Sequence, residues 1–233
     1  MSFWSEQGGV ISSKFKEVFG KIFYERQNKL WEENLYLSYI TYPAQNTGDI
    51  DIRKVFNVTA EGENILKAEL VKIDKSIFNL EEDKKVAKIR AYINDLMIYI
   101  SDNGGYSAVE YWADPLTILK KRKDDCDGYA VLMAKLMWMS GVRRSNLKVQ
   151  ALDVYDLEGN YNGGHANLIY LDDYDNEWYT IEGSYYPETA VRHWNNSFPQ
   201  RENKMYGNIW WITDDEKSYS TSGKLVIRKG IKN

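Results

Sequence analysis

Apolar residues recur every three or four positions in several stretches of the chain, which is the pattern of an amphipathic helix. Residues 13 to 37 show this spacing, and so do residues 81 to 101, which end before the turn-like sequence DNGG. A shorter helix is predicted over 114 to 121, because Asp114 can cap it and Pro115 suits its first turn.

A further helix is predicted to begin at Cys126, the only cysteine of the chain. Asp125 is a suitable N-cap, and the Ser-Gly pair at 140 and 141 suits the end of the helix. The apolar stripe between these ends consists of Ala130, Val131, Ala134, Met137 and Trp138. This helix therefore carries a thiol in its first turn.

Beyond this helix the pattern changes from helical spacing to alternation, which indicates β-strands separated by turn-rich segments. Strands are predicted over 147 to 156, 165 to 171, 177 to 183, 207 to 213 and 224 to 229. Helices followed by antiparallel strands predict an α+β fold, with the cysteine where the helices give way to the sheet.

The first third of the chain is less regular. Residues 41 to 51 combine Pro, Asn, Gly and Asp, which is the composition of a loop. We therefore expect an N-terminal helical extension over 1 to 50 and a main domain over 51 to 233. Residues 52 to 78 alternate weakly, and the sequence EGEN at 61 to 64 is interpreted as a turn between two strands.

The composition excludes several classes of site. One cysteine forms no internal disulfide, and with two histidines it does not supply a zinc site of the usual Cys/His kinds. The net charge is −4 and the basic run at 120 to 123 is short, so we do not expect nucleic acid as a partner. The acidic stretch at 172 to 177 lacks the spacing of an EF-hand and is interpreted as a turn.

Hydropathy gives no sign of a membrane segment. No stretch approaches the ~20 apolar residues of a membrane span, and the first residues lack the apolar run of a signal peptide. We therefore expect no membrane association and a cytoplasmic location.

The thiol of Cys126 is the candidate nucleophile. A cysteine attacks as the thiolate, and a free cysteine titrates near ~8.5, so it needs assistance. The N–H groups of a first helical turn favour a negative sulfur and can bind an oxyanion. Asp125 and Asp127 disfavour the thiolate because they carry the same charge, so a paired imidazole has to supply more of the activation of the thiol. The alternative is a buried cysteine without chemistry.

His165 is the better of two candidate bases, because His193 lies away from any glycine-bounded strand. If the two strands around 165 and 182 form an antiparallel hairpin, Glu182 lies opposite or diagonal to His165 on the same face. A carboxylate there fixes the imidazole tautomer. Asp172 or Asp173 could orient the histidine instead.

The span from 93 to 142 resembles the transglutaminase-like superfamily, especially its bacterial transglutaminase-like cysteine peptidases. The residues that follow the order of the family's motifs are Asn94, Tyr99, Asp102, Trp112, Pro115, Asp125, Cys126, Asp127, Tyr129 and Ala130. The segment from 163 to 183 resembles the family's histidine strand and the strand that carries its acid. The resemblance covers roughly residues 85 to 190, which we expect to be the core of the domain.

The resemblance implies a papain-like arrangement, with a helix packed on an antiparallel sheet, and acyl transfer without a cofactor or metal. It implies Cys126 as nucleophile, His165 as general base and Glu182 as third member, where the family usually has aspartate. Asp124 is a second departure, since the family normally has glycine there.

The surroundings of the reacting atoms follow from the same resemblance. Trp112, Asp125 and Asp127 are expected near them, and Trp112 could assist the oxyanion.

We expect an enzyme that acts on peptide or isopeptide bonds of a protein or peptide substrate. Hydrolysis is favoured over crosslinking, because the chain is small and lacks accessory β-sandwich domains. One alternative is an inactive scaffold that serves as a structural or assembly protein, for instance in a bacteriophage particle, which would place it in the virion. Another is a module that binds a peptide without turnover.

Overall fold

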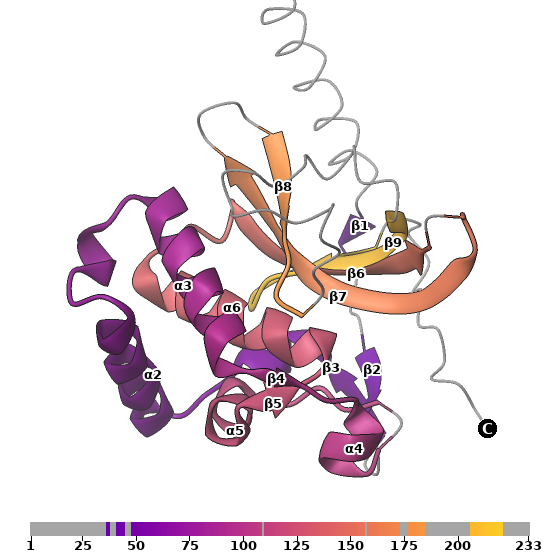
Figure 1. The fold of residues 1–233 in the computed structure, drawn as a ribbon, viewed down its shortest axis with the longest axis horizontal. Coiled ribbons are helices and arrows are strands. Elements are labelled where there is room, and N and C mark those ends of the chain that lie inside the picture. The colour runs from indigo at the N-terminus through magenta and orange to yellow at the C-terminus, as the bar shows by residue number, and fades with distance from the viewer. Residues whose placement is uncertain are drawn as a thin grey trace, which may run out of the picture.

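The structure is a computed structural model. It describes residues 36–37, 41–44, 48–108, 110–156, 158–172, 177–184 and 206–220. Within these residues, helices cover one face of an antiparallel sheet (Figure 1). This is the α+β arrangement that the sequence predicted.

The main sheet has six strands in the order β1-β10-β9-β6-β7-β8, and every neighbouring pair is antiparallel. Its strands are β1 (Tyr36–Leu37), β6 (Leu147–Tyr155), β7 (Tyr161–Asp172), β8 (Glu177–Ile181), β9 (Tyr206–Thr213) and β10 (Ser218–Ser220). The strand predicted over 224 to 229 lies outside the described residues. Because β6 lies between β7 and β9, the sheet brings together strands that are distant in the sequence.

The α-helices are α2 (Ala60–Ile73), α3 (Glu82–Leu96), α4 (Asp102–Tyr106), α5 (Pro115–Lys121) and α6 (Cys126–Ser140). Two 3-10 helices accompany them, η1 (Ile52–Phe56) and η2 (Ile77–Asn79). None of these described helices is both long and apolar enough to cross a membrane.

Helix α6 is the centre of the molecule. It contacts β6 and β7 on one side and α2, α3 and α5 on the other (Figure 1). A helix surrounded in this way is mostly apolar, and Leu132, Met133 and Leu136 are fully buried. Asp125 caps its start and Gly141, at φ 98°, ends it, as the sequence predicted.

The prediction of a turn at 61 to 64 is wrong, because these residues form the first turn of α2. The Thr59 side chain accepts a hydrogen bond from the Gly62 amide at 3.1 Å and so caps the helix. The acidic residues that resembled a turn are those that a helix N-terminus favours. A Cβ atom at position 62 would lie 2.4 Å from the Cδ1 atom of Leu116 on α5, so a larger residue than glycine would collide with that side chain.

The prediction of a loop over 41 to 51 is also wrong. Strands β2 (Thr41–Ala44) and β3 (Gly48–Asp51) pair as a two-stranded antiparallel sheet, so these polar residues form strands. The end of the helix predicted over 13 to 37 is instead strand β1, which pairs with β10. The rest of that helix, and most of the expected extension over 1 to 50, lie outside the described residues.

Two very short strands lead to the start of α6. Strand β4 (Ile98–Tyr99) follows α3, and strand β5 (Lys123–Asp124) precedes Asp125 and Cys126. They pair in parallel, so the segment before the cysteine is tied by backbone hydrogen bonds to the segment after α3.

Candidate active site

Cys126 is the first residue of α6 and is partly exposed. Its position follows from the cap, in which an Asp125 carboxylate oxygen accepts from the Asp127 amide at 3.3 Å. The Asp125 carbonyl accepts the amide of Tyr129 at 3.2 Å, which closes the first turn. The local sequence therefore places the thiol at a helix N-terminus.

His165 and Glu182 lie together. The Nε2 atom of His165 is 3.0 Å from both carboxylate oxygens of Glu182. Strand β7 pairs with β8 so that Leu168 is opposite Ile181, and Glu182 comes one residue later. Glu182 is thus diagonal to His165, one of the two arrangements that the hairpin allowed.

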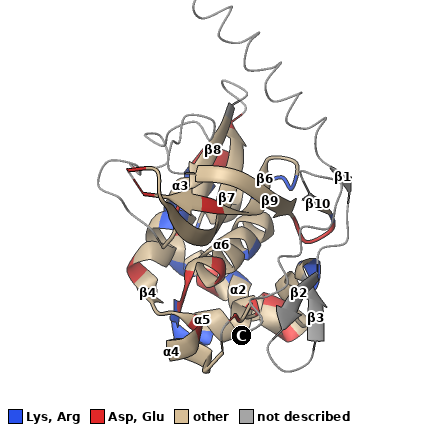
Figure 2. Ribbon diagram, turned by 90° about the vertical axis from the view of Figure 1, so that its right-hand side faces the viewer, with Lys and Arg blue, Asp and Glu red and all other residues tan. Residues whose placement is uncertain are grey.

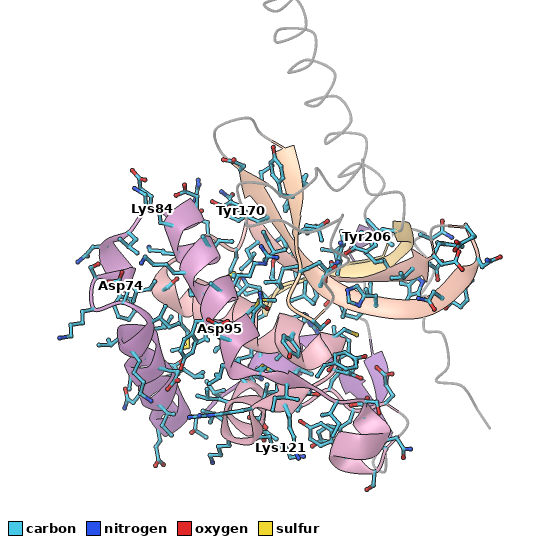
Figure 3. The ribbon with its side chains drawn as sticks, viewed as in Figure 1. Asp74, Lys84, Asp95, Lys121, Tyr170 and Tyr206 are labelled. Atoms are coloured by element: carbon cyan, nitrogen blue, oxygen red, sulfur yellow. The ribbon has the colours of Figure 1, made fainter. Side chains whose placement is uncertain are left out.

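Other polar groups hold the Glu182 carboxylate, which is fully buried. Its Oε1 atom accepts from the side-chain amide of Asn167 at 2.6 Å and from the hydroxyl of Tyr206 on β9. Tyr206 is labelled beside the sheet in Figure 3. The Asn167 oxygen in turn accepts from Gln150 at 2.7 Å. A buried carboxylate with several donors is fixed in position and compensated in charge.

The main chain at Glu182 is also hydrogen-bonded to a helix. Arg90 of α3 donates from Nε to the carbonyl oxygen of Glu182 at 2.8 Å. Arg90, Asn167 and Tyr206 were not expected from the sequence, because their roles depend on contacts between distant elements. Alternation along β7 was the one available signal, since it put Asn167 on the face of His165.

The pKa of His165 is raised above its ordinary value. Burial acts to lower it, but the charge and hydrogen bond of Glu182 and the charge of Asp125 raise it by more. With Nε2–H directed to Glu182, the Nδ1 atom is the ring nitrogen left to exchange a proton.

The Cys126 sulfur lies against strand β7. The backbone N–H of Ala166, the residue after His165, favours the thiolate and so acts to lower the pKa of Cys126. The pKa of Cys126 is nevertheless well above its ordinary value, because burial of the sulfur raises it and the charges of Asp125, Asp127 and Glu110 act in the same direction. The resting form at neutral pH is therefore the thiol.

Five carboxyl groups gather around the first turn of α6. The carboxylate oxygens of Asp102, Asp124 and Asp125 lie within 4.8 Å of one another. Those of Asp102, Glu110 and Asp127 form a second group with the same limit. Spacing along the sequence did not indicate this cluster, because Asp102 and Glu110 come from the segment between α3 and α5.

Burial and mutual repulsion raise the pKa values of the whole cluster. Burial and then Asp125 raise the pKa of Asp102 to about 8, and burial raises that of Asp124 to about 6. Asp127 is raised well above its usual range, by burial and then by Asp125 and Glu110. Within the described part of the chain, the buried Oδ1 atoms of Asp102 and Asp127 have no hydrogen-bond partner. Such oxygens fit a hard divalent cation.

Trp112 belongs to the same cluster. Its indole N–H donates to the Glu110 carboxylate at 2.7 Å, and the residue is buried. An oxyanion role for Trp112 would require this N–H to leave Glu110.

Asp124, which occupies the place of a family glycine, is fully buried. It accepts from the hydroxyl of Tyr106 at 2.7 Å and from the amide of Asp125 at 3.0 Å. A Cβ at Gly128 would lie 2.2 Å from the Asp124 carboxyl carbon. The aspartate therefore occupies space that the glycine at 128 leaves free.

Of the remaining candidates, the structure describes only Asp172. Asp172 ends β7, seven positions from His165, which is roughly 20 Å along a strand. Asp173 and His193 lie outside the described residues.

The fold is similar to that of solved structures. No family model and no curated protein matches the sequence. Calcium-bound LapG of Legionella pneumophila superimposes with a TM-score of 0.52 at 11% identity, over 76% of this chain and 88% of that one. EGTA-treated LapG gives a TM-score of 0.54 at 12% identity, over 76% and 93%. This chain therefore has the same fold as LapG, which agrees with the transglutaminase-like fold that the sequence resemblance implied.

Proposed function

We propose that the chain is a cysteine peptidase in which Cys126 is the nucleophile, His165 the general base and Glu182 the orienting carboxylate. The observation that carries this proposal is the distance of 3.0 Å between His165 Nε2 and Glu182. His165 lies on strand β7, and the backbone N–H of the next residue, Ala166, acts to lower the pKa of the Cys126 thiol.

The first half of the proposed reaction forms a thioester. As the sulfur adds to the peptide carbonyl carbon, the thiol proton passes to His165 Nδ1. The raised pKa of His165 favours the resulting imidazolium, which Glu182 stabilises. The N–H groups at the start of α6 stabilise the oxyanion. On collapse of the tetrahedral intermediate, the C–N bond breaks and His165 gives its proton to the leaving amine.

The second half releases the enzyme. Water attacks the thioester carbonyl carbon, His165 takes a proton from that water, and the C–S bond breaks to give a carboxylic acid and the thiol. We propose water rather than a lysine amine as the acceptor, which makes the reaction a hydrolysis.

Alkylation of the thiol tests this proposal. Iodoacetamide at neutral pH is expected to modify Cys126 faster than it modifies the same protein carrying His165→Ala, by about 10-fold or more, because the base is lost. His193→Ala is the matched control and is expected to react like the parent. Equal rates in the parent and in His165→Ala would favour an inactive scaffold.

Hydrolysis requires its own measurement. A peptide library digested with the full chain and analysed for new termini is expected to show cleavage that Cys126→Ala abolishes and Glu182→Gln reduces by about 100-fold or more. Cleavage that survives Cys126→Ala would contradict the proposal.

We further propose that a divalent cation, with the oxygen preference of calcium, is held by Asp102, Glu110 and Asp127. The carboxylate oxygens of these residues lie close together, and two of them are buried without a partner among the described residues. A calcium-bound form of the similar LapG fold also supports this choice of ion. When bound, the ion would neutralise carboxylates that raise the pKa of Cys126.

Thermal unfolding with calcium or EGTA tests the cation site. Calcium is expected to raise the Tm of the parent, since an ion that binds only the folded state stabilises it. Asp127→Asn should fold but lose this response, whereas Glu61→Gln, a change at an exposed acid of α2, should keep it. An unchanged Tm in the parent at millimolar calcium would contradict the site.

A further inference from the structure

A short strand beside the nucleophile exposes two large side chains. Ile98 and Tyr99 of β4 are 72% and 56% exposed, which is unusual for residues of these types in adjacent positions. Tyr99 is in register with Asp124 of β5, two residues before Cys126, so β4 lies beside the segment that leads into α6. Strand β4 therefore exposes two large side chains close to the first turn of α6, which carries Cys126.

One backbone edge of β4 is taken up by β5. The amides of Ile98 and Ile100 donate to the carbonyls of Arg122 and Asp124, both at 3.0 Å. In a parallel pair the residue between two such donors directs its own N–H and C=O to the opposite edge. Within the described part of the chain β4 pairs with β5 alone, so the edge at Tyr99 is available to an added strand.

The outer face of this strand pair is basic. Ile98 is in register with Lys123, so their side chains lie on one face, and Tyr99 is in register with the buried Asp124 on the other. Residues 120 to 123 are a run of four exposed cations, seen as blue ribbon beside β4 and α5 in Figure 2. Asp124 belongs to the carboxyl cluster around Cys126 and lies on the other face of the pair from Lys123.

Two of the four cations are already engaged. Lys121, labelled at the molecule's edge in Figure 3, donates to the Gly105 carbonyl at 3.0 Å, and its Nζ lies 3.4 Å from the Tyr106 ring centre. Arg122 interacts with Glu69 of α2. Among the described residues, Lys120 and Lys123 form no ion pair.

We propose that the open edge of β4, together with Lys120 and Lys123, binds an extended acidic segment of the substrate next to the bond that is cut. The segment adds to β4 as a strand, contacts Ile98 and the Tyr99 ring, and places carboxylates beside the two lysines. This inference rests on the proposed peptidase function and specifies its substrate as a peptide with acidic residues flanking the scissile bond.

Binding to the inactive full chain tests the inference. The probes are two pools of fluorescent peptides with the same apolar positions, one with glutamate and one with glutamine at the remaining positions. With Cys126→Ala protein, the glutamate pool is expected to bind about ten-fold more tightly by fluorescence polarisation, and this advantage should shrink as salt screens the charges.

Variants locate the binding site. Lys120→Glu combined with Lys123→Glu should remove the preference for glutamate, whereas Lys67→Glu combined with Lys75→Glu, two exposed lysines outside this surface, should keep it. Ile98→Ser and Tyr99→Ala should weaken the binding of both pools. Equal binding of the two pools, or a preference that survives the first charge reversal, would overturn the inference.

A nucleic acid is the other anion that such a surface could attract. A short single-stranded DNA that displaced the glutamate pool and bound more tightly through Lys120 and Lys123 would also overturn the inference. A failure of this inference can be told apart from a failure of the proposed peptidase function. Peptide binding is measured with Cys126→Ala protein, which has no thiol and does not need the reaction.

Discussion

At the scale of single residues, the groups around Cys126 act on its proton in opposite directions. Burial, Asp125, Asp127 and Glu110 raise the pKa of the thiol, and the Ala166 amide lowers it. His165 has a raised pKa of its own, owing to Glu182 and Asp125. The resting site thus combines a protonated thiol with an imidazole of raised pKa, and under the proposed function the thiol proton passes to that imidazole as the sulfur attacks.

Glu182→Gln should lower the pKa of His165. The carboxylate raises this pKa, so its loss leaves burial, which lowers the pKa, as the larger effect. NMR titration of the ring measures the change, and His193→Gln assigns the signal because the chain has two histidines. An unchanged pKa would mean that Glu182 does not control the imidazole.

The same change has a defined effect on stability against pH. A histidine whose pKa is raised by folding stabilises the protein fully below its unfolded value of 6.5, and this stabilisation is lost as the pH rises through the folded pKa. The unfolding free energy of the parent should therefore fall over that window, and the fall should be absent in Glu182→Gln. Urea unfolding at several pH values measures the difference.

At the scale of elements, the junction of β5 and α6 is adapted to Asp124. This residue is fully buried, is held by Tyr106, and lies where a side chain at 128 would project. The family pattern has glycine before Asp-Cys, whereas this chain has its glycine four positions later, one turn along the helix. The two positions fit as a pair.

Gly128→Ala should destabilise the protein by about 1–3 kcal/mol, because its Cβ would collide with Asp124 and repacking at a buried junction is costly. Combining it with Asp124→Gly should recover part of the loss, since the obstructing carboxylate is removed. Gly105→Ala is the control, as its Cβ would meet only Ile100, at 3.4 Å. Additive losses in the double variant, measured by urea unfolding, would contradict the pairing.

Several elements could be predicted from the sequence because their signals are local. Asp114 caps α5 by accepting from the amides of Leu116 and Thr117, at 3.0 and 3.1 Å, and Pro115 begins the helix. Other elements escaped prediction. The polar first turn of α2 has the composition of a turn, and β4 and β5 are too short to show alternation.

At the scale of the whole molecule, the packing of α6 in the core fixes the position of the candidate site at its first turn. Its buried side chains lie between the sheet and the other helices, and its first residue is the candidate nucleophile. A second, smaller apolar cluster of Ile169, Trp178 and Ile212 joins β7, β8 and β9. The position of Cys126 relative to β7 thus depends on the core as a unit.

Leu132→Ala should cost about 2–5 kcal/mol, because Leu132 is fully buried in α6 and the change leaves a cavity. Ile65→Ala, at a residue that is 41% exposed on α2, should cost far less. Urea unfolding measures both. Similar losses at the two positions would contradict the central place of α6 in the core.

The sequence by itself determined the features that depend on a few neighbouring residues. A cap, an apolar run and a closing glycine place Cys126 at the start of a helix, and alternation identifies the strands that carry His165 and Glu182. Tertiary structure decided how distant segments meet. Only the sheet order brings Tyr206 to Glu182, and only the packing between α3, α5 and α6 gathers Asp102, Glu110 and Asp127. Such contacts depend on how whole elements are arranged in space, and the conformational preferences of neighbouring residues do not specify that arrangement.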